Sequence, residues 1–102
     1  MVDIASLRAE DFERLVGDRF AVAVDGVDGG EFELLAAEPQ DTGHERVEAF
    51  AVMFLGVGVP TFDQQTVTLS HAAVGRFDLF VVAVAEDERG RRYEAVFTRL
   101  VD

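Results

Sequence analysis

The chain has 102 residues, of which 49% are hydrophobic, with 20 acidic residues, nine basic residues and no cysteine. This length favours one domain, and an apolar content that includes nine Phe excludes a disordered chain. The absence of cysteine excludes disulfide scaffolds and thiolate metal sites. The net charge of −11 argues against nucleic acids and anionic membranes as partners, because both bind clustered basic residues.

The N-terminal part of the chain predicts one short helix over about residues 8–16. Phe12, Leu15 and Val16 recur there at helical spacing, with charged residues between them. Two turns of helix are not stable alone, so we expect this helix to dock against the rest of the domain. The chain starts with neither the basic segment nor the apolar run of a secretory signal, and we expect a cytoplasmic protein.

From residue 19 onward the apolar residues recur with a period of two, and turns that contain glycine separate the segments. We predict six strands, at about residues 19–24, 31–38, 47–55, 65–70, 77–85 and 92–100. The connections are too short for parallel crossovers, which need a dozen or more residues. The sequence therefore predicts one mainly β domain over residues 1–102, a six-stranded antiparallel barrel or sandwich with one short N-terminal helix.

Two of these strands, at residues 47–55 and 77–85, are apolar on both faces. An antiparallel strand with one face in water alternates apolar with polar residues, so something must cover the second face of each. We expect the helix to cover part of this surface, at one end of a barrel or across a sheet, and self-association to cover the rest. The interface candidates are the alternate residues Phe50, Val52, Phe54, Phe80, Val82 and Val84.

No motif amounts to a catalytic or metal-binding constellation. The acidic turn at residues 25–31 has Val27 where a calcium loop needs a ligand, and the loop at residues 41–45 has one His with no second His nearby. Ser70 and His71 are adjacent in a strand, so their side chains point to opposite faces. We therefore predict no enzymatic activity, no catalytic residue, no cofactor and no metal.

Three functions stay open from these residues. The first is a non-enzymatic structural or interaction module that self-associates or belongs to a larger assembly, with protein as its partner and neither nucleic acid nor membrane. The second is a small ligand-binding β-barrel, whose interior holds an apolar molecule beneath the helix as a lid. The third is a minor enzyme in which His71 acts with Asp63 or Asp78.

Residues along nearly the whole chain carry a family resemblance. They are Leu7, Asp11-Phe12, Leu15-Val16-Gly17, Phe20, Phe54, Gln65, Leu69-Ser70-His71, Gly75, Leu79-Phe80 and the closing Tyr93-Glu94-Ala95-Val96-Phe97. In this pattern the chain resembles an uncharacterised family of small bacterial domains of unknown function, although Thr98 stands where that family usually has Asn. The resemblance implies genes that lie near those of phage-tail-like collar proteins, and with them an assembly or accessory role.

Overall fold

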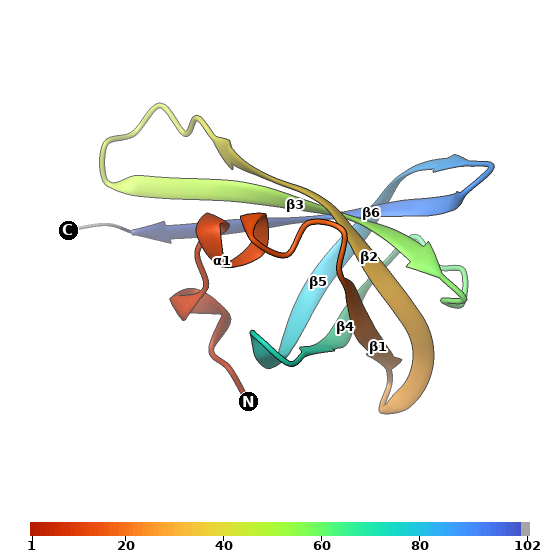
Figure 1. The fold of residues 1–102 in the computed structure, drawn as a ribbon. Helices are drawn as coiled ribbons and strands as arrows, with labels where there is room; N and C mark the ends of the chain where they lie inside the picture. Colours follow the sequence, from red (N-terminus) through yellow and green to blue (C-terminus); the bar gives the residue numbers. More distant parts are fainter. Residues whose placement is uncertain (101–102) are drawn as a thin grey trace.

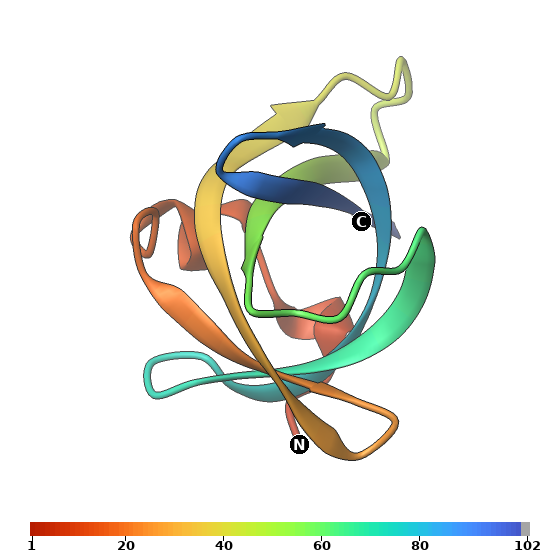
Figure 2. The same ribbon diagram turned by 90° about the vertical axis from the view of Figure 1, so that its right-hand side faces the viewer.

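The computed structural model describes residues 1–100, in which six antiparallel strands close into a barrel (Figures 1 and 2). The order around the barrel is β1-β2-β3-β6-β5-β4, and β4 pairs back with β1. The fold class predicted from the sequence is confirmed, and five of the observed strands extend beyond the predicted ranges. The strands are β1 (Arg19–Val24), β2 (Val27–Gln40), β3 (Val47–Val57), β4 (Gln64–His71), β5 (Gly75–Asp87) and β6 (Gly90–Leu100).

Aromatic side chains fill the barrel interior. The rings of Phe50 and Phe97 stack with centroids 4.6 Å apart, and Phe32 stacks on Tyr93 at 5.1 Å. Because inward and outward side chains alternate along each strand, every strand adds a row of apolar groups to this core. The interior is therefore a packed core of side chains.

The N-terminal segment closes one end of the barrel. It contains a 3₁₀ turn, η1 (Ile4–Ser6), and a helix, α1 (Ala9–Glu13), which is shorter than the predicted range of residues 8–16. The helix gives way to a turn because Gly17 takes a φ of 97° and donates its N–H to the carbonyl of Leu34 in β2, at 2.8 Å. Phe12 of α1 is fully buried, and its ring centroid lies 5.4–6.3 Å from four rings inside the barrel, those of Phe20, Phe50, Phe77 and Phe97.

The loop between β3 and β4 covers the opposite end. Its Phe62 ring lies 4.8 Å from the ring of Tyr93, centroid to centroid. One guanidinium nitrogen of Arg91 donates to the carbonyl of Phe62 and to Asp63, both at 3.0 Å, and thereby holds the loop against β6. Both ends of the barrel are thus capped by segments outside the strands.

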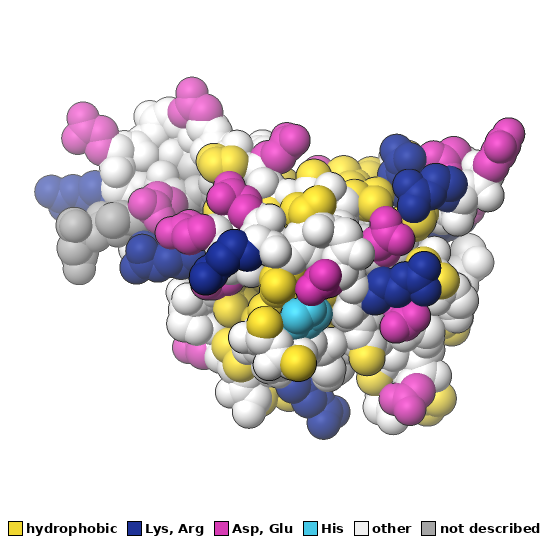
Figure 3. Space-filling model, viewed as in Figure 1, with side chains coloured by type: hydrophobic (Ala, Val, Ile, Leu, Met, Phe, Trp, Pro, Cys, Tyr) yellow, Lys and Arg dark blue, Asp and Glu magenta, His cyan; other side chains and the backbone are white. Residues whose placement is uncertain are grey.

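The face of the molecule seen in Figure 3 mixes charges of both signs. Arg side chains lie beside acidic ones there, and no extended basic surface is visible on this face. Within residues 1–100, no helix has the length and apolar character needed to cross a membrane.

Candidate interaction surface

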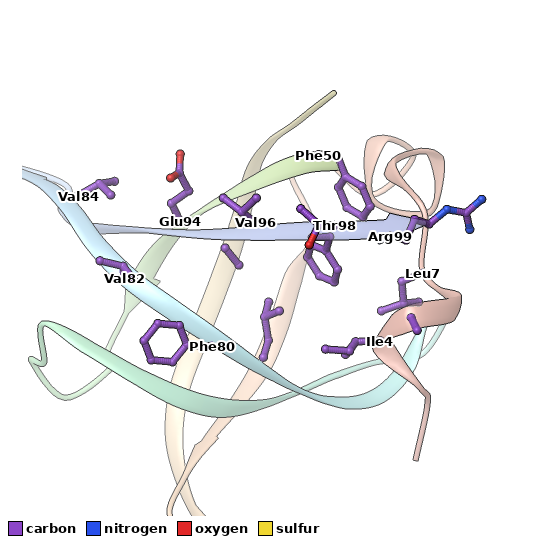
Figure 4. A pocket seen from close by; sticks show the side chains of 14 residues that line it. Ile4, Leu7, Phe50, Phe80, Val82, Val84, Glu94, Val96, Thr98 and Arg99 are labelled. Atoms are coloured by element: carbon purple, nitrogen blue, oxygen red, sulfur yellow. The ribbon is translucent and has the colours of Figure 1, made fainter. Parts of the chain in front are cut away.

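The strands β5 and β6 are paired along only part of their length. Residues 82–87 of β5 pair with residues 90–94 of β6, whereas the earlier part of β5 pairs only with β4. Beyond Glu94, β6 continues beside β3 as far as Leu100. The two strands therefore diverge, as Figure 4 shows, and a groove of about 570 Å³ lies between them.

Apolar side chains line this groove at two depths. Its floor is made of core residues that are almost completely buried, namely Leu7, Phe50, Leu79, Ala95 and Phe97. Its walls carry large apolar side chains that face solvent: Phe80 is 52% exposed, Val82 37%, Val84 48% and Val96 57%. We call these four residues the β5–β6 face. Exposed apolar side chains that lie next to one another, unlike scattered ones, are typical of contact surfaces.

The structure places the six interface candidates in two different environments. Phe80, Val82 and Val84 lie on the outer side of β5 and belong to the β5–β6 face. The other three, Phe50, Val52 and Phe54, are enclosed by the barrel, with exposed fractions of 6%, 0% and 0%. This corrects the expectation for Val52 and Phe54, which the barrel encloses completely, whereas Phe50 still lines the floor of the groove. The bulk of all three fills the core, while smaller side chains occupy most of the outer face of β3.

Two large, exposed apolar residues of the groove, Val96 and Ile4, were not among the candidates predicted from the sequence. Val96 lies between Glu94 and Thr98 on the face of β6 that carries mostly polar residues. The alternation of apolar and polar residues along β6 therefore showed it as a single apolar residue on a polar face. Ile4 precedes the predicted helix and is 42% exposed in η1, at the end of the groove (Figure 4). The pairing of β5 with β6 stops at Val82 and Glu94, which leaves the groove between Phe80 and Val96, and the sequence pattern carries no signal for that divergence.

His71 has a different partner from those considered for an enzyme. Its Nε2 lies 2.9 Å from a carboxylate oxygen of Asp18, and the backbone N–H of Ala73 donates to its Nδ1 at 2.9 Å. Because Nδ1 accepts, the hydrogen-bond network assigns the proton to Nε2, which donates to Asp18. Both ring nitrogens are engaged, and the side chain ties the segment before β1 to the turn after β4.

The two carboxylates expected beside His71 have other partners. Asp63 pairs with Arg91 at 3.0 Å, and Asp78 accepts a hydrogen bond of 2.6 Å from the hydroxyl of Thr68.

Two groups at the capped end near Phe62 have shifted pKa values. Hydrogen bonds to Glu86 and Asp63 raise the pKa of the Arg91 guanidinium, and burial raises the pKa of the Tyr93 phenol. Among residues 1–100, no three His, Asp or Glu side chains gather in a group that would hold a metal ion.

Comparisons with known proteins identify a family. No curated protein and no solved structure matches the chain. The sequence profile of one family matches residues 7–97, a range that contains both capped ends of the barrel and the whole β5–β6 face. This match confirms the resemblance to an uncharacterised family. The chain belongs to the family described as Domain of unknown function (DUF6916).

Proposed function

We propose that this domain is a non-enzymatic interaction module that self-associates through the β5–β6 face. The observation that carries the proposal is the cluster of four exposed apolar side chains on a barrel whose core is already filled. Exposing these side chains to water is unfavourable, at roughly 25 cal/mol per Å² of apolar surface. Contact with another apolar surface removes that cost, so the face favours association.

The distribution of charge supports the same proposal. The chain carries a net charge of −11, yet among residues 1–100 Glu94 is the only acidic residue that lines the groove. The one basic residue there, Arg99, pairs with Glu48 at 3.1 Å. Because the central part of a protein interface is typically poor in charged residues, the groove has the composition of a contact surface.

The experiment measures molar mass by light scattering as a function of concentration. We expect the mass of the wild type to rise above that of a monomer as the concentration approaches about 1 mM, the weak end of specific association. Phe80→Glu places a charge in the β5–β6 face without disturbing the core and is expected to stay monomeric. The matched control is Val27→Glu, because Val27 is 68% exposed and is the first residue of β2, beside the turn that follows β1 and outside the groove.

Two outcomes contradict self-association through this face. One is a wild type that stays monomeric over the whole range. The other is equal association by the two Glu variants, which would place the contact elsewhere on the molecule. Circular dichroism and urea unfolding of both variants confirm that the fold is retained.

A second function is favoured by the size of the groove. Its volume of about 570 Å³ falls among typical small-molecule sites, which span roughly 300–1,000 Å³. Side chains fill the barrel interior, so a small apolar ligand would occupy this groove and not the centre of the barrel. A monomeric wild type that binds one molecule of the apolar dye ANS saturably, with loss of binding in Phe80→Glu, would favour this second function over the first.

A further inference from the structure

We infer that the partner at the β5–β6 face is a second copy of this chain, which adds its own β6 antiparallel to residues 95–100 of β6. The two strands would be related by a twofold axis and would join the two barrels through one continuous sheet. This inference rests on the proposed self-association and specifies how it takes place.

The first observation is an unpaired strand edge. On one side, β6 pairs with β3 from Arg92 to Leu100, and on the other side its pairing with β5 stops at Glu94. The 3₁₀ turn η1 lies beside this open side, but its backbone hydrogen bonds run within the turn itself, to Asp3 and Ile4. No strand among residues 1–100 pairs with the open side of residues 95–100.

The pairing pattern shows which backbone groups face the open side. Gly90 pairs with Asp87 across a two-residue turn, so these two residues exchange hydrogen bonds. Alternate residues of a strand direct their N–H and C=O groups to opposite neighbours. Every second residue after Gly90 therefore faces the β5 side, and beyond the last pair these are Val96, Thr98 and Leu100.

The second observation is that nothing in this edge opposes pairing. Strand edges are commonly protected by Pro, Lys, a bulge or inward-pointing charge. Residues 95–100 contain no Pro and no Lys, and they pair with β3 without a register shift. Their one charged side chain is that of Arg99, which Glu48 neutralises. An edge of this kind is open to a further strand.

The identity of the partner follows from symmetry and charge. Antiparallel pairing is self-complementary, so an open edge fits the same edge of a second copy, and a twofold contact closes at the dimer. With the axis at Thr98, each Val96 lies opposite the partner's Leu100 and the two Thr98 side chains face each other. Within residues 95–100 these outward side chains are uncharged, so this paired segment places no like charges opposite each other in a strongly acidic protein.

The test removes one backbone donor from the open edge. Thr98→Pro lacks the N–H that faces the open side but leaves the N–H groups of Phe97 and Arg99, which face β3. Thr98→Ala changes the side chain alone and serves as the control. We expect Thr98→Pro to raise the dissociation constant of the dimer about tenfold or more, because each dimer loses two hydrogen bonds. Thr98→Ala is expected to associate like the wild type.

A second measurement on the wild type does not depend on the folding of any variant. Amide hydrogen exchange at Val96 and Thr98 is expected to slow as the protein concentration rises, because pairing protects these two groups in the dimer. Amides in β1, which already pairs on both sides with β2 and β4, provide the internal control, since their exchange does not depend on concentration.

The outcomes separate the inference from the proposed function. If Phe80→Glu abolishes association while Thr98→Pro preserves it, and exchange at Val96 and Thr98 is independent of concentration, the face is an interface but the strands do not pair. That result overturns the inference and leaves the proposed function standing. A wild type that is monomeric at about 1 mM overturns both.

Discussion

At the scale of single residues, the side chain of Tyr93 shows how the core and the surface meet. Tyr93 is 1% exposed and stacks on Phe32 inside the barrel, while Phe62 covers it from the β3–β4 loop. It is also the only tyrosine of the chain, so the tyrosinate absorbance of the protein comes from this one side chain. The phenol thus reports on the packing of the capped end that it occupies.

The raised pKa of Tyr93 predicts a loss of stability at high pH. Burial disfavours the charged phenolate, so the folded-state pKa lies above the unfolded value of about 10. The resulting stabilisation is complete below the unfolded pKa and is lost as the pH rises through the folded pKa. We expect tyrosinate absorbance to appear at higher pH in the native protein than in the urea-unfolded chain. Superimposed titration curves would show that the phenol is not buried.

Tyr93→Phe is the matched control for that measurement. The substitution keeps the ring and removes the ionising group, so the free energy of unfolding of the variant is expected to decline less between neutral pH and high pH. A decline equal to that of the wild type would assign the pH dependence to other groups, such as the arginines.

At the scale of elements, α1 is held by one side chain. A helix of five residues has no stability of its own, and the buried ring of Phe12 is its main contact with the core. We expect Phe12→Ala to lower the free energy of unfolding by about 3–5 kcal/mol, as for other buried Phe residues. Urea unfolding measures this change, with the exposed neighbour Glu13→Ala as the control. A loss as small as that of the control would mean that the helix is dispensable for the barrel.

The strands could be predicted from the sequence because their causes are local. A period of two from residue 19 onward and glycine-containing turns mark all six, and loops too short for parallel crossovers imply antiparallel pairing. The C-terminal end of α1 depends on a contact distant in the sequence, the hydrogen bond from Gly17 to Leu34, so the predicted helix was too long. The 3₁₀ turn at Ile4–Ser6 was not predicted; the carboxylate of Asp3 caps it.

The candidate surface could be predicted only in part, for a physical reason. Periodicity shows which residues share a face of a strand but not which face lies inside when both faces are apolar. In β3 the bulky residues Phe50, Val52 and Phe54 fill the barrel, whereas in β5 the inner positions go to Phe77, Leu79 and Val81. That leaves Phe80 outside. The divergence of β5 and β6 beyond Glu94, which opens the groove beside Val96, is a matter of pairing between strands that periodicity does not show.

At the scale of the whole molecule, both ends of the barrel are capped, but β5 and β6 are unpaired along part of their length. Phe12 caps one end and Phe62 the other, while the unpaired parts of β5 and β6 leave the groove between them. The large apolar side chains of the β5–β6 face lie in a part of the surface with few charged groups, although the molecule has a net charge of −11. In the self-association that we propose, two opposing effects set the affinity: apolar contact at the β5–β6 face and electrostatic repulsion between two molecules of the same net charge.

The balance of these two effects predicts an unusual response to salt. Two copies that each carry a net charge of −11 repel one another, and salt screens this repulsion over a Debye length of about 10 Å at 0.1 M. Among the described residues that line the groove, the one basic side chain, Arg99, is already paired with Glu48 of its own chain and is not available to the partner's carboxylates. We expect the dissociation constant of the dimer to fall as sodium chloride is raised, with Val27→Glu following the same trend and Phe80→Glu staying monomeric throughout. Light scattering at a fixed concentration over a salt series measures this response. Weaker association at higher salt would mean that ion pairs between the two copies, and not the apolar β5–β6 face, hold the dimer together.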